Sequence, residues 1–134
     1  SAIIRCSQPL VSGSNRRCRE DEQLLNAMLG PSSRGYIFDT RTPNAALQAK
    51  AKGGGFEQEM FYSRWKRAHK PIQRWTTLQE SLAKLVDACN EKNISPDKWL
   101  SKLNSCNWLQ TVLDCLNCAC VVAQCVDREG ETAG

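Results

Sequence analysis

The chain has 134 residues, which is the size of one domain with a core of its own, and its 41% apolar and 24% charged residues exclude wholesale disorder. The formal net charge of +4 permits an acidic partner, such as a phosphate-bearing lipid or a nucleic acid, without requiring one. No apolar run approaches the roughly 18 residues that a membrane-spanning helix needs. The first ten residues lack the layout of a signal peptide, so nothing indicates secretion.

The first third of the chain is expected to contain a strand and a helix. Residues 2–6 (AIIRC) are predicted to form a short buried strand, which ends in the turn region of Pro9 and Gly13. A helix is predicted over 18–29, because acidic residues fill its first turn, where they favour the helix dipole. A Gly-Pro pair directly after this segment stops the helix.

The middle of the chain continues the alternation. Residues 35–40 (GYIFDT) form an aromatic and β-branched run that predicts a central strand. Residues 44–52 (NAALQAKAK) favour a short helix, which the three glycines that follow must end. Residues 60–75 are aromatic and basic without a clear period, and we expect an irregular strand and loop there.

The second half is expected to be helical. Residues 75–91 carry one apolar face at helical spacing, formed by Leu78, Leu82, Leu85, Val86 and Cys89. In residues 95–103, Ser95 is the predicted N-cap and Pro96 the first helical residue, and the inward side chains are Trp99, Leu100 and Leu103. A last helix over about 107–126 has few polar residues and is expected to be buried on several sides. The fold class is therefore α/β, helix-rich with a few strands, and two or three strands are few for so much apolar helix surface.

The eight cysteines are expected to be free thiols, since no secretory signal is present. Cys115 and Cys118 form a C-x-x-C pair and Cys125 falls on the same helical face, so a zinc site has to be considered. Zinc sites built on such pairs need a second, distant pair of ligands, and the only histidine, His69, has no partner nearby. We therefore predict no metal site and interpret these cysteines as small apolar residues of a buried helix.

No catalytic arrangement is recognisable in the segment. One histidine in a basic loop does not complete a Ser-His-Asp triad, and the three glycines lack the spacing of nucleotide-binding loops. Cysteine-based phosphatases need a Cys-x5-Arg loop, and none of the eight cysteines has an arginine six positions later. The sequence predicts no catalytic residue and no cofactor.

Two basic segments are candidates for anion binding. In residues 50–59 (KAKGGGFEQE) the glycines either end a helix and turn the chain, or hold an anion; the contacting residues would be Lys50, Lys52, Gly53, Gly54 and Gly55. A second basic stretch, interleaved with Trp65 and Trp75, either faces an anionic membrane or is a solvated surface; it comprises Arg64, Lys66, Arg67, Lys70 and Arg74.

Six motifs occur together in this chain: RCSQPL, RRCREDEQLL, FDTR, AKAKGGGFEQE, LQESLAKLVDAC and WLSKLNSCNWL. In this set and order, and over nearly its whole length, the chain resembles the myotubularin family of phosphoinositide phosphatases, and within it the catalytically inactive branch. The resemblance implies the front half of an enlarged cysteine-phosphatase-like fold. Residues 1–134 would form a partial myotubularin domain that ends before the catalytic loop.

The resemblance also implies departures from the active members. They carry asparagines where this chain has Ala45 and Ala49, and the second of these lies at the lipid headgroup. A further headgroup asparagine corresponds to Arg74, which attracts phosphate with a different geometry. Losing such polar contacts costs about 1–3 kcal/mol each, which favours the inactive branch. On this interpretation the glycine segment is a structural corner that was retained after catalysis was lost.

The function implied by the resemblance is that of a pseudophosphatase, which binds and regulates active myotubularin-related phosphatases in a hetero-oligomer. The alternative is an active 3-phosphatase for phosphatidylinositol 3-phosphate or 3,5-bisphosphate, whose Cys-x5-Arg loop lies beyond residue 134. We expect a cytoplasmic protein, peripheral on endomembranes at a phosphoinositide surface, with no nucleic-acid partner. A self-standing α/β interaction domain is a third interpretation, and it leaves unexplained why so apolar a last helix has so little sheet to pack on.

Overall fold

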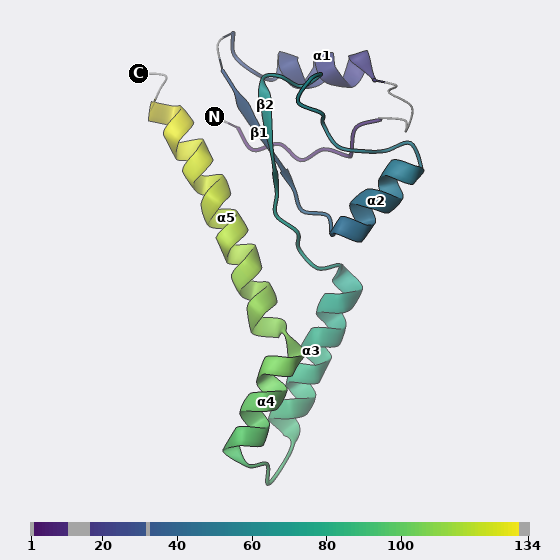
Figure 1. Ribbon diagram of the computed structural model, residues 1–134. Helices are drawn as coiled ribbons and strands as arrows, with labels where there is room; N and C mark the ends of the chain where they lie inside the picture. The colour runs from purple at the N-terminus through teal and green to yellow at the C-terminus, as the bar shows by residue number, and fades with distance from the viewer. Residues whose placement is uncertain (1, 11–16, 32, 132–134) are drawn as a thin grey trace. The chain divides into compact units, whose positions relative to one another are not determined.

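The structure is a computed structural model that describes residues 2–10, 17–31 and 33–131 (Figure 1). In chain order, the elements of the described residues are α1 (Arg19–Ala27), β1 (Gly35–Asp39), α2 (Pro43–Ala51), β2 (Trp65–His69), α3 (Trp75–Asn90), α4 (Pro96–Cys106) and α5 (Trp108–Glu131). This confirms the predicted helix-rich α/β class with few strands. Contacts within the chain divide it into two units, residues 1–71 with 124–134 and residues 72–123, and each is described by itself.

The first unit is built on a two-stranded parallel sheet. β1 pairs with β2 in a register that runs from Gly35 opposite Trp65 to Asp39 opposite His69. The strand and helix predicted over 35–40 and 44–52 are thus confirmed to within one residue as β1 and α2, and β2 lies in the segment where an irregular strand and loop were expected. Within the described residues β1 has a neighbour on one side only, so the expected central position of this strand is not observed there.

The amino-terminal segment differs from its prediction. Residues 2–6 form no strand, and the side chains of Ile3 and Ile4 are exposed. Apolar composition does not supply the partner that a strand needs for its hydrogen bonds, and the pairing found in this segment is an isolated antiparallel bridge between Leu10 and Gly54. The predicted turn at Gly13 lies outside the described residues. The helix predicted over 18–29 is observed as the slightly shorter α1.

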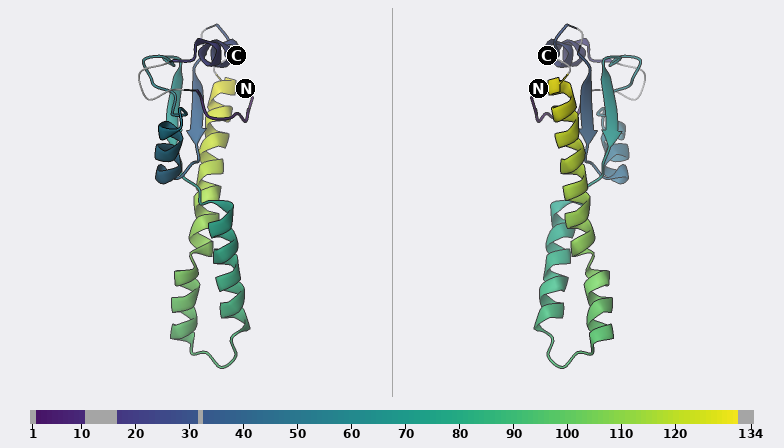
Figure 2. Two further views of the ribbon diagram at one scale, coloured as in Figure 1. Left: turned by 90° about the vertical axis from the view of Figure 1, so that its right-hand side faces the viewer. Right: turned by 90° about the vertical axis from the view of Figure 1, so that its left-hand side faces the viewer.

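In the second unit, α3 and α4 lie side by side as a helical hairpin (Figure 2). The buried residues of α3 are Ser81 and Ala88, which lie two turns apart and share one face. The predicted apolar face is only partly correct, because Leu82 and Val86 are exposed. Small side chains occupy the buried face of this helix, so larger neighbours are left at its edge.

The helix α4 begins as predicted, with Ser95 as N-cap and Pro96 in the first turn. Its inward face is shifted from the predicted one. Cys106 is buried and Trp99 and Leu103 are half-buried, but Leu100 is 56% exposed. The prediction that Leu100 points inward was therefore wrong.

A single residue separates α4 from α5. Asn107 adopts the left-handed conformation, with φ of 62°, and α5 begins at the next residue. The two carbonyls at this break are bound by hydroxyl groups: Ser81 Oγ donates to the Cys106 carbonyl at 2.5 Å, and Thr111 Oγ1 donates to the Asn107 carbonyl at 3.0 Å. The break between the helices is therefore stabilised by side chains of α3 and α5.

We expect Ser81→Ala to lower the free energy of unfolding by about 1–2 kcal/mol, because it leaves a buried carbonyl without a donor. Urea titration measures the change. The matched control is Ser105→Ala, whose exposed hydroxyl also donates to a backbone carbonyl, that of Lys102 at 2.9 Å. Because water replaces an exposed donor, the control should change stability by no more than about 0.5 kcal/mol. Equal losses in the two variants would contradict the role assigned to Ser81.

The length, composition and exposure of the last helix differ from two expectations. Within α5, Trp108–Arg128 is 21 residues long with a mean hydropathy of 1.5, so by length and composition it is sufficient to cross a membrane, contrary to the expectation that no segment is. Scattered polar residues interrupt every apolar run but leave the average high. The helix was also expected to be buried on several sides, yet its exposed residues include Leu109, Val112, Leu113 and Leu116. Core helices of soluble proteins pass the same test of length and composition, so this finding does not assign the helix to a membrane.

Candidate functional site

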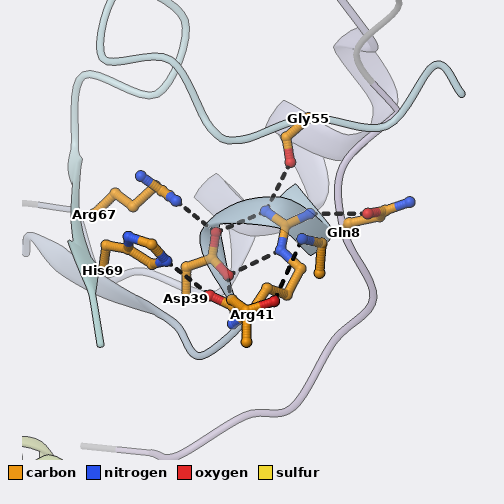
Figure 3. A network of polar contacts seen from close by, with 8 residues as sticks. Gln8, Asp39, Arg41, Gly55, Arg67 and His69 are labelled. Carbon is orange, nitrogen blue, oxygen red and sulfur yellow. Dashed lines mark hydrogen bonds and ion pairs between the residues drawn. The ribbon is translucent and has the colours of Figure 1, made fainter. Parts of the chain in front are cut away.

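The most extensive polar network of the first unit surrounds Asp39 at the carboxyl end of β1 (Figure 3). This side chain is only 6% exposed. Its carboxylate accepts hydrogen bonds from Arg41 Nε at 2.9 Å, from Arg41 Nη2 at 2.6 Å and from Arg67 Nη2 at 2.6 Å. The parallel register explains the contact with β2, because Asp39 lies opposite His69, two residues beyond Arg67 and on the same face. We call Asp39, Arg41 and Arg67 the Asp39 cluster.

Arg41 connects this cluster to two other segments of the first unit. Its Nη2 also donates to the Gly55 carbonyl at 3.0 Å, and its Nη1 donates to Gln8 Oε1 at 2.8 Å. The Arg41 carbonyl lies 2.7 Å from His69 Nε2 (Figure 3). One arginine thus holds together the end of β1, the glycine segment and the amino-terminal segment.

The Asp39 cluster has one carboxylate for two guanidiniums, and the neighbouring Glu57 supplies a second carboxyl group. Burial by itself would raise the pKa of Asp39, but the hydrogen bonds from Arg41 and Arg67 outweigh it and hold that pKa well below its usual range. Burial raises the pKa of Glu57, and the negative charge of Asp39 acts in the same direction. The Arg67 guanidinium also lies over the ring of Phe56, 4.4 Å from its centroid. Two guanidiniums therefore face two carboxyl groups, an arrangement that supports the fold and leaves no clear excess of positive charge for an anionic ligand.

The glycine segment ends α2 in a Schellman motif. Gly53 has φ of +86°, its amide donates to the Lys50 carbonyl at 3.3 Å, and the Gly54 amide donates to the Ala49 carbonyl at 2.9 Å. Among the predicted anion-contacting residues, Gly53 and Gly54 thus use their amides within the helix end. The Lys50 and Lys52 side chains are exposed. Anion binding here stays a prediction, and it would depend on the two lysines more than on those two amides.

The Schellman motif gives a direct prediction for Gly53. We expect Gly53→Ala to cost about 1–2 kcal/mol of stability, because alanine is strained at positive φ and no atom lies within 4 Å of its added Cβ to clash with it. Gly53→Asn should lose less, since asparagine tolerates this conformation better. Thermal unfolding of the two variants measures the difference. Equal losses would show that the left-handed backbone is not the cause.

The second basic stretch is partly used inside the fold. Arg64 Nη2 donates to the carbonyls of Gly30 and Ser33, and Arg67 belongs to the Asp39 cluster. The side chains that remain exposed are Lys66, Lys70, Arg74 and Trp75. A membrane-facing role for this smaller set stays a prediction.

The two substituted headgroup positions fall in different units. Ala49 lies half-buried in the last turn of α2, where its carbonyl accepts the Gly54 amide. Arg74 is the exposed N-cap residue of α3, and its side chain makes no capping hydrogen bond. Their part in headgroup binding stays a prediction.

The cysteines are free thiols, as predicted. Cys118 is buried, Cys115 and Cys125 are half-buried and Cys120 is exposed, so their interpretation as small apolar residues of a buried helix is met only in part. Within the described part of the chain, no group of three or more histidine, cysteine, aspartate or glutamate side chains is placed to hold a metal ion.

Sequence reasoning did not identify the Asp39 cluster. The available signal was an aspartate at the end of a strand with an arginine two residues later, in the motif FDTR. That spacing is too common to indicate a role. The other partners, Gly55, Arg67 and Gln8, are brought in by the fold.

Comparison with known proteins places the chain in a family. A family model described as a myotubularin-like phosphatase domain matches residues 1–133. Myotubularin-related protein 9 of Mus musculus and that of Homo sapiens are each 56% identical over 128 residues, which cover 96% of this chain and 24% and 23% of those proteins. Phosphatidylinositol-3,5-bisphosphate 3-phosphatase MTMR6 of Mus musculus is 36% identical over 129 residues, or 94% of this chain and 21% of that protein. The chain thus spans less than a quarter of the length of these curated relatives. The family match over nearly every residue agrees with the six ordered motifs, and the chain belongs to the myotubularin-like phosphatase domain family.

Proposed function

We propose that the protein is a pseudophosphatase of the myotubularin family, which binds active phosphoinositide 3-phosphatases of the same family and regulates them. The observation that carries the proposal is Ala49. By the family resemblance, active members place a headgroup-binding asparagine there, and a methyl group offers no hydrogen bond to a lipid phosphate. The substitution at Arg74 adds to it, since a guanidinium binds with a different geometry.

The glycine segment supports the same proposal. The amides of Gly53 and Gly54 donate to carbonyls of α2, and the Gly55 carbonyl accepts from Arg41. The segment therefore keeps its shape through contacts inside the protein and needs no bound phosphate. This is the behaviour expected of a corner that is retained for folding after catalysis is lost.

The alternative is an active 3-phosphatase for phosphatidylinositol 3-phosphate or 3,5-bisphosphate. It is favoured by the 36% identity to MTMR6, whose name states a 3-phosphatase activity. It requires a Cys-x5-Arg loop outside residues 1–134 and a pocket that tolerates Ala49 and Arg74. The identity to myotubularin-related protein 9, whose name states no activity, is higher at 56%. The active phosphatase is therefore the second candidate.

The proposal includes a place of action. We expect a cytoplasmic protein that is peripheral on endomembranes, because its partners act on phosphoinositides. Of the basic stretch, Lys66, Lys70 and Arg74 with Trp75 are the exposed side chains that could meet an anionic lipid surface.

The test uses the full-length protein, alone and co-expressed with an active myotubularin-related 3-phosphatase. Phosphate release is measured from phosphatidylinositol 3-phosphate and from the 3,5-bisphosphate. We expect no release by the protein alone, co-purification with the phosphatase, and a changed rate of the complex. Phosphate release by the protein alone would establish that it is an active 3-phosphatase. If the protein neither released phosphate nor co-purified with the phosphatase, both proposed functions would be overturned.

Introducing an asparagine side chain at position 49 tests the role of Ala49. We expect Ala49→Asn to strengthen binding to vesicles containing phosphatidylinositol 3-phosphate by roughly threefold to tenfold, the effect of one added hydrogen bond. The control is Ala51→Asn, two residues later in α2 and exposed. Vesicle co-sedimentation measures both. Equal binding by the two variants would show that residue 49 has no specific part in headgroup binding.

A further inference from the structure

The chain contains two hydroxyl residues that precede a proline, and each caps a helix. Thr42 precedes Pro43 at the start of α2, and Ser95 precedes Pro96 at the start of α4. Both have extended backbones, with φ and ψ of −63° and 152° for Thr42 and −69° and 151° for Ser95. Proline imposes this conformation on the residue before it. The backbones are therefore equivalent, and any difference between the sites lies in the side chains and their surroundings.

The two hydroxyl groups differ in what they contact. Thr42 is half-buried, and its Oγ1 accepts a hydrogen bond from the Ala45 amide at 3.4 Å. Ser95 is exposed, and its side chain makes no capping hydrogen bond. The residue three positions further along also differs, since it is Ala45 in one case and the exposed Lys98 in the other.

We propose that Ser95 is a phosphorylation site for a proline-directed protein kinase and that Thr42 is not. Kinases of this class bind the acceptor in an extended strand, require proline directly after it, and in several cases bind a basic side chain three positions after the acceptor. Ser95 itself is extended and is followed by Pro96, and Lys98 stands three positions later in the first turn of α4, which has to unwind for the kinase to bind that side chain. Thr42 lacks the basic residue, and its hydroxyl would first have to leave the helix end.

The surroundings of Ser95 suit access by an enzyme. It lies at the end of the loop 91–95 that connects α3 and α4 (Figure 2). The loop contains the exposed Lys92 and the left-handed Asn93, with φ of 60°. Exposed loops between helices are where modifying enzymes reach a folded chain most readily.

The reaction and its product follow from general chemistry. The Ser95 hydroxyl attacks the γ-phosphorus of ATP, the bond to the bridging oxygen breaks, ADP leaves, and the hydroxyl proton passes to the catalytic base of the kinase. The product adds a charge of about −1.5 to −2 beside the free amides of the first turn of α4. The helix dipole and the nearby Lys98 stabilise this charge, and Asp97 opposes it.

The experiment incubates the folded full-length protein with a cyclin-dependent kinase and ATP, and locates phosphate by mass spectrometry of the peptides that contain residues 42 and 95. We expect phosphate on Ser95, none at that peptide in Ser95→Ala, and unchanged labelling of Ser95 in Thr42→Ala. Lys98→Ala should lower kcat/KM at Ser95 about tenfold, the loss expected for one charged contact. Circular dichroism should show that Ser95→Ala is folded, because its hydroxyl makes no capping bond. Phosphate on Thr42 in place of Ser95, or an unmodified Ser95, would overturn the proposal.

Discussion

Asp39→Asn should lower the free energy of unfolding by about 3–5 kcal/mol, the range seen when one partner of a buried ion pair is removed. The amide accepts hydrogen bonds but carries no charge, so the guanidiniums of Arg41 and Arg67 would face each other without the anion between them. Both arginines are largely buried, with side chains 25% and 22% exposed. Urea titration at neutral pH measures the loss.

The matched control is an exposed ion pair in the second unit. Glu91 and Lys102 form a contact in which both side chains are well exposed, at 37% and 43%. Glu91→Gln should therefore cost less than about 1 kcal/mol, because water screens the lost charge. If the two variants lost the same stability, the Asp39 cluster would be an ordinary surface network.

Lowering the pH should reduce the difference in the free energy of unfolding between Asp39→Asn and the unchanged protein. Because the folded-state pKa of Asp39 is held below its unfolded value, its contribution is complete above the unfolded pKa of about 4 and is lost as pH falls towards the folded value. Asparagine does not titrate, so the variant lacks this part of the pH dependence. Unfolding curves measured at pH 7 and pH 3 should show a smaller difference in unfolding free energy between the two proteins at pH 3.

Gly35→Ala should cost about 3 kcal/mol, at the upper end for overpacking by one methyl group. A Cβ at this position would lie 2.3 Å from Trp65 Cε3 and Cζ3, far inside van der Waals contact. Trp65 is the residue paired with Gly35 in the sheet register, so its ring covers the strand where the glycine leaves room. Moving the ring would disturb the sheet itself.

The control for this variant is Gly30→Ala. The nearest atom to its added Cβ is Ser33 Oγ at 3.1 Å, the end of a short side chain that can rotate away. We expect a change below about 1 kcal/mol, measured by thermal unfolding beside Gly35→Ala. Similar losses in the two variants would mean that the Trp65 ring adapts and does not fix the sheet.

Local signals predicted the helices well. The Ser95-Pro96 pair and the three glycines after α2 fix helix ends through the few residues around them, and the structure places those ends within a residue of the prediction. Contacts between elements were predicted less well. The sequence favoured Leu82 and Val86 as the inner face of α3, but the buried face is formed by Ser81 and Ala88, a choice that depends on the neighbouring helix.

The same distinction explains the misplaced strand and the missed cluster. Residues 2–6 have the composition of a strand, but a strand also needs a partner, which composition does not reveal. Of the partners of Arg41, Asp39 is local, but Gln8 and Gly55 lie 33 and 14 residues away, and no local pattern joins them to Arg41. Charge balance around Asp39 is a property of the folded chain and could not be obtained from the sequence alone.

The Schellman turn after α2 has a consequence for how relatives are sorted. The positive φ of Gly53 requires glycine there, and a Cβ on Gly54 would lie 2.4 Å from Gln8 Nε2, so folding alone favours the glycines of the run KGGG at these two positions. A search keyed to that run would collect catalysts and non-catalysts alike. Ala49 lies one turn earlier and its side chain is not required by the turn geometry. Positions of this kind distinguish relatives that still bind the substrate from those that do not.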